Sequence, residues 1–184
     1  MDAITSARLL DLALPVAKRV RATIEALELE GIYVRIVQGV RSWNQQGDLY
    51  AKGRTAPGEP CSHPGGIRSA GDCQEHPLGL TVTKARPGQS YHQFAMAADL
   101  VPDDPTKPGY QPVWDAGHPH YARLVAIATS KGLVCGAEWR SFPDYPHVQY
   151  TGRFPASPTD EVRQLFLDGG MIEVWAAAFD GGFE

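Results

Sequence analysis

The stretch SYHQFAMAADLV, residues 90–101, combines polar side chains with a backbone that has room to fold back on itself. His92 and Asp99 are seven positions apart, and alanines at positions 95, 97 and 98 between them allow a tight turn. The segment 97–101, AADLV, predicts a strand. We therefore expect a turn to bring His92 beside Asp99 on the strand that follows.

A second segment, GAEWRSFPDYPHVQY at residues 136–150, adds Asp144 and His147, three positions apart, with His147 opening a strand. Imidazole nitrogens and carboxylate oxygens are zinc ligands, and catalytic zinc sites use three protein ligands and leave one position for water. His92, Asp99 and His147 satisfy that count. Asp144 is then available as a general base that takes a proton from the attacking water.

Helices and strands do not alternate regularly along the chain, and their order predicts an α+β fold, with a small antiparallel sheet flanked by helices. Helices come first and last and short strands lie between them. No repeat and no second apolar block separated by a linker is present, which predicts a single domain over residues 1–184 with no separate binding domain. The predicted helices are 5–30 (with a kink or break at Pro15), 43–53, 119–131, 158–168 (capped by Ser157 or Thr159) and 171–179; the predicted strands are 32–40, 97–101, 134–138 and 146–150.

Residues 55–80 are dense in Gly, Pro, Ser and Asp and predict a long loop, with an insertion at about 56–80. Cys61 and Cys73 lie in this insertion. Three readings stay open for them: a disulfide, two free thiols, or a structural zinc knuckle completed by His63 and His76. The remaining histidines, His118 and His120, are expected to be exposed turn residues at a helix start.

The composition is that of an ordinary globular protein, with 184 residues, 43% hydrophobic residues, 21% charged residues and a net charge of −4. The absence of a basic excess disfavours nucleic acid and anionic membranes as partners. No signal peptide and no stretch of about 20 apolar residues is recognisable. We expect a monomer, synthesised in the cytoplasm and not inserted into a membrane.

Both segments resemble the signature of the peptidoglycan-cutting zinc peptidases, which include VanY-like D,D-carboxypeptidases and phage L-alanyl-D-glutamate endopeptidases. The family shows Ser-x-His-x-x-Gly-x-Ala-x-Asp and, further on, an acidic-Trp pair followed by Asp-x-Pro-His. The corresponding residues here are Ser90, His92, Ala95, Ala97 and Asp99, and then Glu138, Trp139, Asp144, Pro146 and His147. The chain departs from the family at Ala95, where a positive φ would penalise an alanine, and at Glu138, where relatives often have Asp.

A third segment, GVRSWNQQGDLYAKGRT at residues 39–55, is similar to the family's Arg-Ser-x-x-x-Gln-x-x-Leu-Tyr-x-x-Gly-Arg stretch. The resemblance implies that Arg41 and Gln46 face the site. Arg41 would stabilise an oxyanion or hold a substrate carboxylate, whereas Arg54 is expected to be structural. Gln46, Ser90, Trp139 and Gln149 are the expected substrate-contacting or ligand-orienting residues; Trp139 is equally compatible with the core.

The resemblance implies a fold like that of the hedgehog domain and the D-Ala-D-Ala peptidases, one zinc ion, and hydrolysis of peptidoglycan stem peptides with Asp144 as the base. An L-alanyl-D-glutamate endopeptidase of the endolysin type, released to the cell wall through a holin-type pore, is the first expectation. A VanY-type D,D-carboxypeptidase is the alternative, and a non-catalytic zinc-binding module of the same fold is the second.

Overall fold

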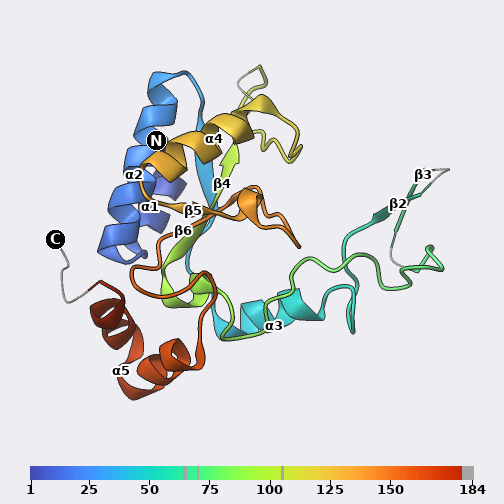
Figure 1. The fold of residues 1–184 in the computed structure, drawn as a ribbon. Coiled ribbons are helices and arrows are strands. Elements are labelled where there is room, and N and C mark those ends of the chain that lie inside the picture. Colours follow the sequence, from blue (N-terminus) through green and yellow to red (C-terminus); the bar gives the residue numbers. More distant parts are fainter. Residues whose placement is uncertain (64–65, 70, 105, 180–184) are drawn as a thin grey trace.

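An antiparallel sheet with the strand order β1-β4-β6-β5 lies at the centre of the computed structural model, which describes residues 1–63 (without the side chain of His63), 66–69, 71–104 and 106–179. Helices flank this sheet, as the predicted α+β arrangement requires (Figure 1). The strands of the sheet are β1 (Val34–Gln38), β4 (Ala97–Pro102), β5 (Val134–Cys135) and β6 (His147–Gln149), and the helices are α1 (Ala3–Leu10), α2 (Leu14–Leu29), α3 (Trp43–Ala51), α4 (Pro119–Ser130) and α5 (Asp160–Ala178).

The first helical segment is divided in two, because the helix is interrupted between α1 and α2, and Pro15 lies in the first turn of α2. Proline is tolerated there, since the first backbone N–H groups of a helix lack intrahelical partners. Asp2 caps α1 by accepting a hydrogen bond from the Thr5 backbone N–H at 2.8 Å. The prediction of one helix over 5–30 is thus resolved in favour of a break.

The apolar side of α2 packs against α4 and the sheet and forms the main core. Val20, Ile24 and Leu27 of α2 are fully buried, as is Leu100 of β4. Burial of each such side chain contributes about 1.5–3 kcal/mol relative to exposure. The central strand β4 is therefore held rigidly from one face, which matters because it carries Asp99.

A cluster of aromatic rings joins α3, α5 and the short 3-10 turn η1 (Tyr91–Phe94). The Phe94 ring lies 6.1 Å from Trp43 and 5.7 Å from Phe166, both in edge-on geometry. The Trp175 indole N–H also donates a 2.7 Å hydrogen bond to the Phe94 carbonyl. These contacts fix η1, the turn that carries His92, against the C-terminal helix.

Several predicted boundaries shift. The predicted strand 134–138 is shorter, because a 3-10 turn, η2 (Gly136–Glu138), follows β5 directly. The predicted helices 158–168 and 171–179 both lie within α5. Between them, Gly169 and Gly170 have non-helical backbone angles, so the predicted break is present as a kink. Thr159 is the N-cap, and its side chain accepts from the Val162 backbone N–H.

Residues 56–80 form an arm that projects from the end of α3, away from the central sheet (Figure 1). The predicted loop contains a small antiparallel hairpin of β2 (Cys61–His63) and β3 (Gly66–Arg68). At the start of α4, His118 acts as the N-cap, but the expectation of two exposed turn residues is wrong, because His118 and His120 are both partly buried and His120 lies within the helix. Over the described part of the chain, no helix combines the length and the apolarity that crossing a bilayer requires.

Candidate metal centre

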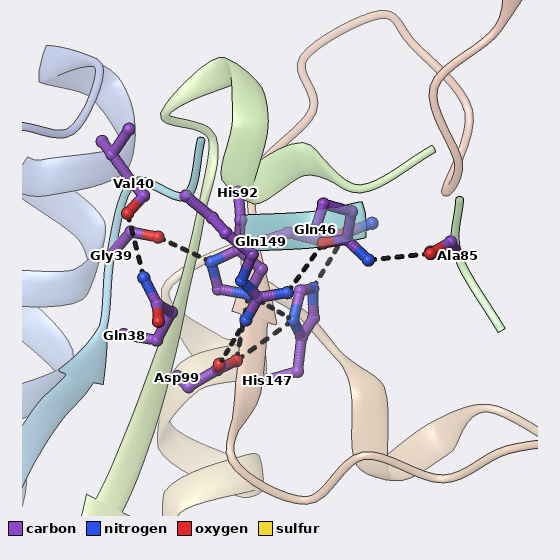
Figure 2. Close-up of polar contacts among 10 residues, drawn as sticks. Gln38, Gly39, Val40, Gln46, Ala85, His92, Asp99, His147 and Gln149 are labelled. Atoms are coloured by element: carbon purple, nitrogen blue, oxygen red, sulfur yellow. Dashed lines mark hydrogen bonds and ion pairs between the residues drawn. The ribbon is translucent and has the colours of Figure 1, made fainter. Parts of the chain in front are cut away.

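His92, Asp99 and His147 come together from three separate elements (Figure 2). His92 lies in η1, Asp99 in β4, and His147 opens β6, where it is the direct cross-strand partner of Asp99. Ala95 has a left-handed conformation at the end of η1, with φ 57°. This turn brings η1 back over β4, as the spacing of His92 and Asp99 predicts.

The three potential ligand atoms are spaced as a tetrahedral zinc site requires. His92 Nε2 lies 3.1 Å from Asp99 Oδ1 and 3.1 Å from His147 Nδ1, and His147 Nδ1 lies 3.3 Å from Asp99 Oδ1. Two ligand atoms that are each about 2.0–2.1 Å from a tetrahedral zinc ion are separated by about 3.3 Å. The donor set therefore fits zinc without rearrangement of the backbone.

The outward-facing nitrogen of each histidine is held by an acceptor oxygen, which determines which nitrogen is left for a metal. His92 Nδ1 lies 2.7 Å from the Gly39 carbonyl, which can only accept. His147 Nε2 lies 3.0 Å from Gln149 Oε1, and the Gln149 amide donates to the Ala156 carbonyl at 2.8 Å. His92 Nε2 and His147 Nδ1 therefore present their lone pairs to the centre of the cluster.

The charge of each residue in the cluster shifts the pKa of its neighbours. Burial raises the pKa of Asp99, but the charges of and hydrogen bonds from His92 and His147 outweigh burial and leave that pKa well below its usual range. Burial lowers the pKa of His147. The hydrogen bond with Asp99 and the negative charge of Asp99 outweigh this effect, so the pKa of His147 is raised overall. A cation would replace the proton that this cluster otherwise retains, so metal binding must release protons.

Arg41 lies beside the cluster and is anchored at several points. Its backbone N–H donates to the His92 carbonyl at 3.0 Å, and its guanidinium lies 3.4 Å from Asp99 Oδ2. A third contact, at 2.9 Å, runs from Arg41 Nη1 to Gln46 Oε1. Gln46 was expected to touch substrate, but it is fully buried and also donates to the Ala85 carbonyl at 2.8 Å. It thus links Arg41 to the segment that lines one wall of the cleft.

The cluster opens into a cleft with a volume of about 680 Å³. Asp144 and Ser90 line it, and neither side chain bonds to the three candidate ligands within the described residues. Burial and the nearby charge of Asp99 raise the pKa of Asp144.

Trp139 lines the cleft and packs on the His147 ring at 4.9 Å, which favours a position beside the cleft over one in the core. The expected site residues at the cleft are Arg41, Ser90, His92, Trp139, Asp144, His147 and Gln149.

Sequence reasoning missed the backbone that supports this site. A Cβ at Gly136 would lie 2.6 Å from the Asp144 carbonyl oxygen and 2.9 Å from His147 Cβ, so only glycine fits. The Gly136 carbonyl also accepts hydrogen bonds from the Trp139 and Asp144 backbone N–H groups. The carbonyls of Gly39 and Ala156, which orient His92 and Gln149, leave no signal in the side-chain pattern.

Comparisons with known proteins show which proteins this chain resembles. Residues 83–150, which contain all three candidate ligands and Asp144, match the family model described as D-alanyl-D-alanine carboxypeptidase. Over 127 residues the chain is 31% identical to the peptidoglycan L-alanyl-D-glutamate endopeptidase CwlK of Bacillus subtilis, an alignment that covers 65% of this chain and 62% of the relative. These matches confirm the predicted resemblance to peptidoglycan peptidases.

The fold is similar to that in the crystal structure of the L-Ala D-Glu endopeptidase ChiX of Serratia marcescens. The TM-score is 0.51 at 18% sequence identity, and the superposition covers 82% of this chain and 89% of that one. At this identity the likeness bears on the fold, and it confirms the predicted α+β class.

Proposed function

Because residues 83–150 match a family of cell-wall peptidases, we propose that this chain is a zinc peptidase that hydrolyses a peptide bond in peptidoglycan stems, as an L-alanyl-D-glutamate endopeptidase. The observation that carries the proposal is the set of three ligand atoms, His92 Nε2, Asp99 Oδ1 and His147 Nδ1, at tetrahedral spacing at the base of a cleft. Three protein ligands leave one position for water, as in catalytic rather than structural zinc sites.

A zinc ion held by these residues supplies a lowered pKa for water and a Lewis acid for the scissile carbonyl. Asp144 provides the proton transfers. Its carboxylate has no hydrogen-bond partner within the described residues, and its pKa is raised by burial and by Asp99. A raised pKa brings the carboxylate closer to the range in which one group can accept a proton from the attacking water and return it to the leaving amine.

Arg41 stabilises the negative charge that develops on the carbonyl oxygen of the substrate. Its guanidinium lines the cleft and is held between Asp99 and Gln46, so the charge is aimed before substrate arrives. Preorganised donors of this kind are more effective than mobile ones because they need no reorganisation during the reaction. Gln46 is then a positioning residue for Arg41, and Gln149 is one for His147.

Two observations support an acidic stem peptide as substrate. Lys84 and Arg140 line the cleft together with Arg41, so the cleft presents three cations, and the relative from Bacillus subtilis is named as an L-alanyl-D-glutamate endopeptidase. The family description, D-alanyl-D-alanine carboxypeptidase, supports the second candidate. The site of action is then the cell wall; release through a holin, a monomeric state and a single domain remain predictions.

Incubation of the zinc-loaded protein with a purified stem peptide, followed by mass spectrometry, tests the proposal. Cleavage between L-Ala and D-Glu is expected; release of D-Ala alone would establish the carboxypeptidase instead. Asp144→Asn should keep zinc and lose about 10²–10⁴-fold in kcat. The matched control is Glu138→Gln, which removes another cleft-lining carboxylate and should stay near wild-type activity. Full activity of Asp144→Asn would reject Asp144 as the base, and no cleavage of any stem peptide by the zinc-loaded wild type would favour a non-catalytic module.

A further inference from the structure

The arm of residues 56–80 has almost no apolar core. Within its described residues, the buried ones are Cys61, Cys73 and Gly79. Ile67, the apolar residue of β3, is 77% exposed. A hairpin this short gains too little from hydrophobic burial to hold one conformation, and small protein units of this kind commonly depend on a disulfide or a metal.

The two buried thiols of the arm face an imidazole. Potential ligand atoms of Cys61, Cys73 and His76 all lie within 4.8 Å of one another. Cys73 Sγ and His76 Nδ1 are 3.7 Å apart, close to the separation of about 3.5 Å expected for a thiolate and an imidazole on one tetrahedral zinc ion. The arrangement has the donor types and spacing of a zinc site, although no zinc-binding sequence pattern in common use describes it.

A backbone contact adds independent support. The His76 backbone N–H donates to Cys73 Sγ at 3.3 Å, so the Cys-x-x-His turn wraps around the sulfur. A sulfur acceptor gains most from such a bond when it carries the negative charge of a thiolate, which is the form that binds metal.

We propose that the arm holds a second, structural zinc ion through Cys61, Cys73 and His76. Thiolate and imidazole ligands together select zinc among the abundant divalent ions. His63, two residues after Cys61 in β2, is the candidate for the fourth ligand by sequence; its side chain lies outside the described residues, and the proposed site is defined by the other three. Zinc replaces the missing core, so that metal binding and ordering of the arm are one event.

This ion would take no part in hydrolysis, but the arm that holds it leads directly into the segment that lines the cleft. The chain leaves the arm at Leu80 and immediately forms the wall made by Val82, Thr83, Lys84 and Ala85. At its base the arm is tied down, since the Leu80 N–H donates to the Glu59 carbonyl at 2.7 Å and Arg54 donates to the Thr83 carbonyl at 3.0 Å. An ordered arm therefore presents this wall in a fixed place.

Cobalt substitution separates the two metal sites, because the site at His92, Asp99 and His147 contains no sulfur. The full-length chain, purified under reducing conditions and loaded with Co²⁺, should show thiolate-to-cobalt charge-transfer absorption in the near ultraviolet. The double variant His92→Ala/His147→Ala should keep these bands, whereas Cys61→Ser/Cys73→Ser should lose them. Cys135→Ala removes the third buried thiol, which lies in the main core, and should keep them.

Zinc content by elemental analysis gives the second readout. The wild type should hold one more zinc ion per chain than Cys61→Ser/Cys73→Ser. Equal zinc content in these two chains, together with the absence of thiolate bands in the wild type and in His92→Ala/His147→Ala, would overturn the proposal. So would a chain mass lower by two hydrogens that reductant restores, because that result assigns the two cysteines to a disulfide. These readouts do not depend on peptidase activity and stand apart from the proposed function.

Discussion

The two candidate metal clusters of this chain differ in their donor atoms and in the structure that supports them. His92, Asp99 and His147 sit on or beside the central sheet, and the outward nitrogens of both histidines are held by other groups. Cys61, Cys73 and His76 sit on a short arm whose described residues bury little apolar surface. The fold shapes the first cluster without a metal, whereas the proposed zinc ion would have to order the second.

Removal of both metals should have the largest effect and should separate the clusters. A strong chelator is expected to reduce hydrolysis to the background rate, because zinc carries the activation of water. In the same sample, amide hydrogen exchange in residues 56–80 should rise until the local opening free energy is about 0 kcal/mol. Exchange in β4 and β6 should stay slow. Loss of protection in β4 on chelation would break the comparison, since it would show that the sheet also needs its metal.

Arg41→Met tests whether the sheet-based site is preorganised beyond its ligands. It should lower kcat by about 10²–10³-fold, the loss found when one oxyanion donor is removed, with unchanged zinc content. Gln46→Ala keeps the guanidinium but removes the hydrogen bond that positions it, and should lower activity by about 10–100-fold. The two variants should be compared by steady-state kinetics on one stem peptide. Equal losses would show that Gln46 does more than hold Arg41, and no loss in either would remove both from the mechanism.

Gly136→Ala tests how tightly the backbone behind the site is packed. The added methyl group must displace the Asp144 carbonyl and His147 Cβ, and such overpacking costs about 1–3 kcal/mol. Urea unfolding of the zinc-loaded chain measures this loss. Gly47→Ala is the control, because the new Cβ in α3 has Pro87 Cγ at 3.7 Å as its nearest neighbour; it should stabilise the chain by about 0.5–1 kcal/mol. If Gly136→Ala were as stable as wild type, the turn behind the site would have to be looser than described.

Ala95→Gly should have the smallest effect. A left-handed residue with a Cβ costs about 1–2 kcal/mol, but glycine loses about 0.5–1 kcal/mol of backbone entropy and about 0.8 kcal/mol of buried methyl. The free energy of unfolding should therefore stay within about 0.5 kcal/mol of the wild type. Ala98→Gly, equally buried but in extended β4, has no strain to release and should lose about 1–2 kcal/mol. Equal losses in both variants would show that the turn at Ala95 is unstrained.

The sequence predicted those parts of the site that depend on side-chain identity. The α+β class follows from the periodicity of the segments, and the convergence of His92, Asp99 and His147 follows from the small residues between the first two and from the position of the third at a strand start. Ala95 stands where the family has glycine, so a positive φ was considered there only as a condition that would penalise alanine, and the structure has that φ. In each case one residue type restricts the local conformation strongly enough to be recognised.

Other features depend on tertiary contacts and had no local signal. The amide oxygens of Gln46 and Gln149 contact Arg41 and His147, and their amide nitrogens donate to the carbonyls of Ala85 and Ala156, which distant segments supply. The hairpin in the arm was hidden by a composition typical of loops. Gly136 was not singled out, because its requirement comes from the approach of Asp144 and His147 rather than from its own φ.

The amide of Gln46 connects Arg41 to the wall of the cleft. Its oxygen holds the guanidinium of Arg41 and its nitrogen holds the main chain at Ala85. A planar amide cannot follow one partner without abandoning the other. A displacement of the cleft wall at Ala85 would therefore also disturb Arg41, so that a ligand seated badly along the wall would alter the position of the positive charge that the proposed mechanism uses.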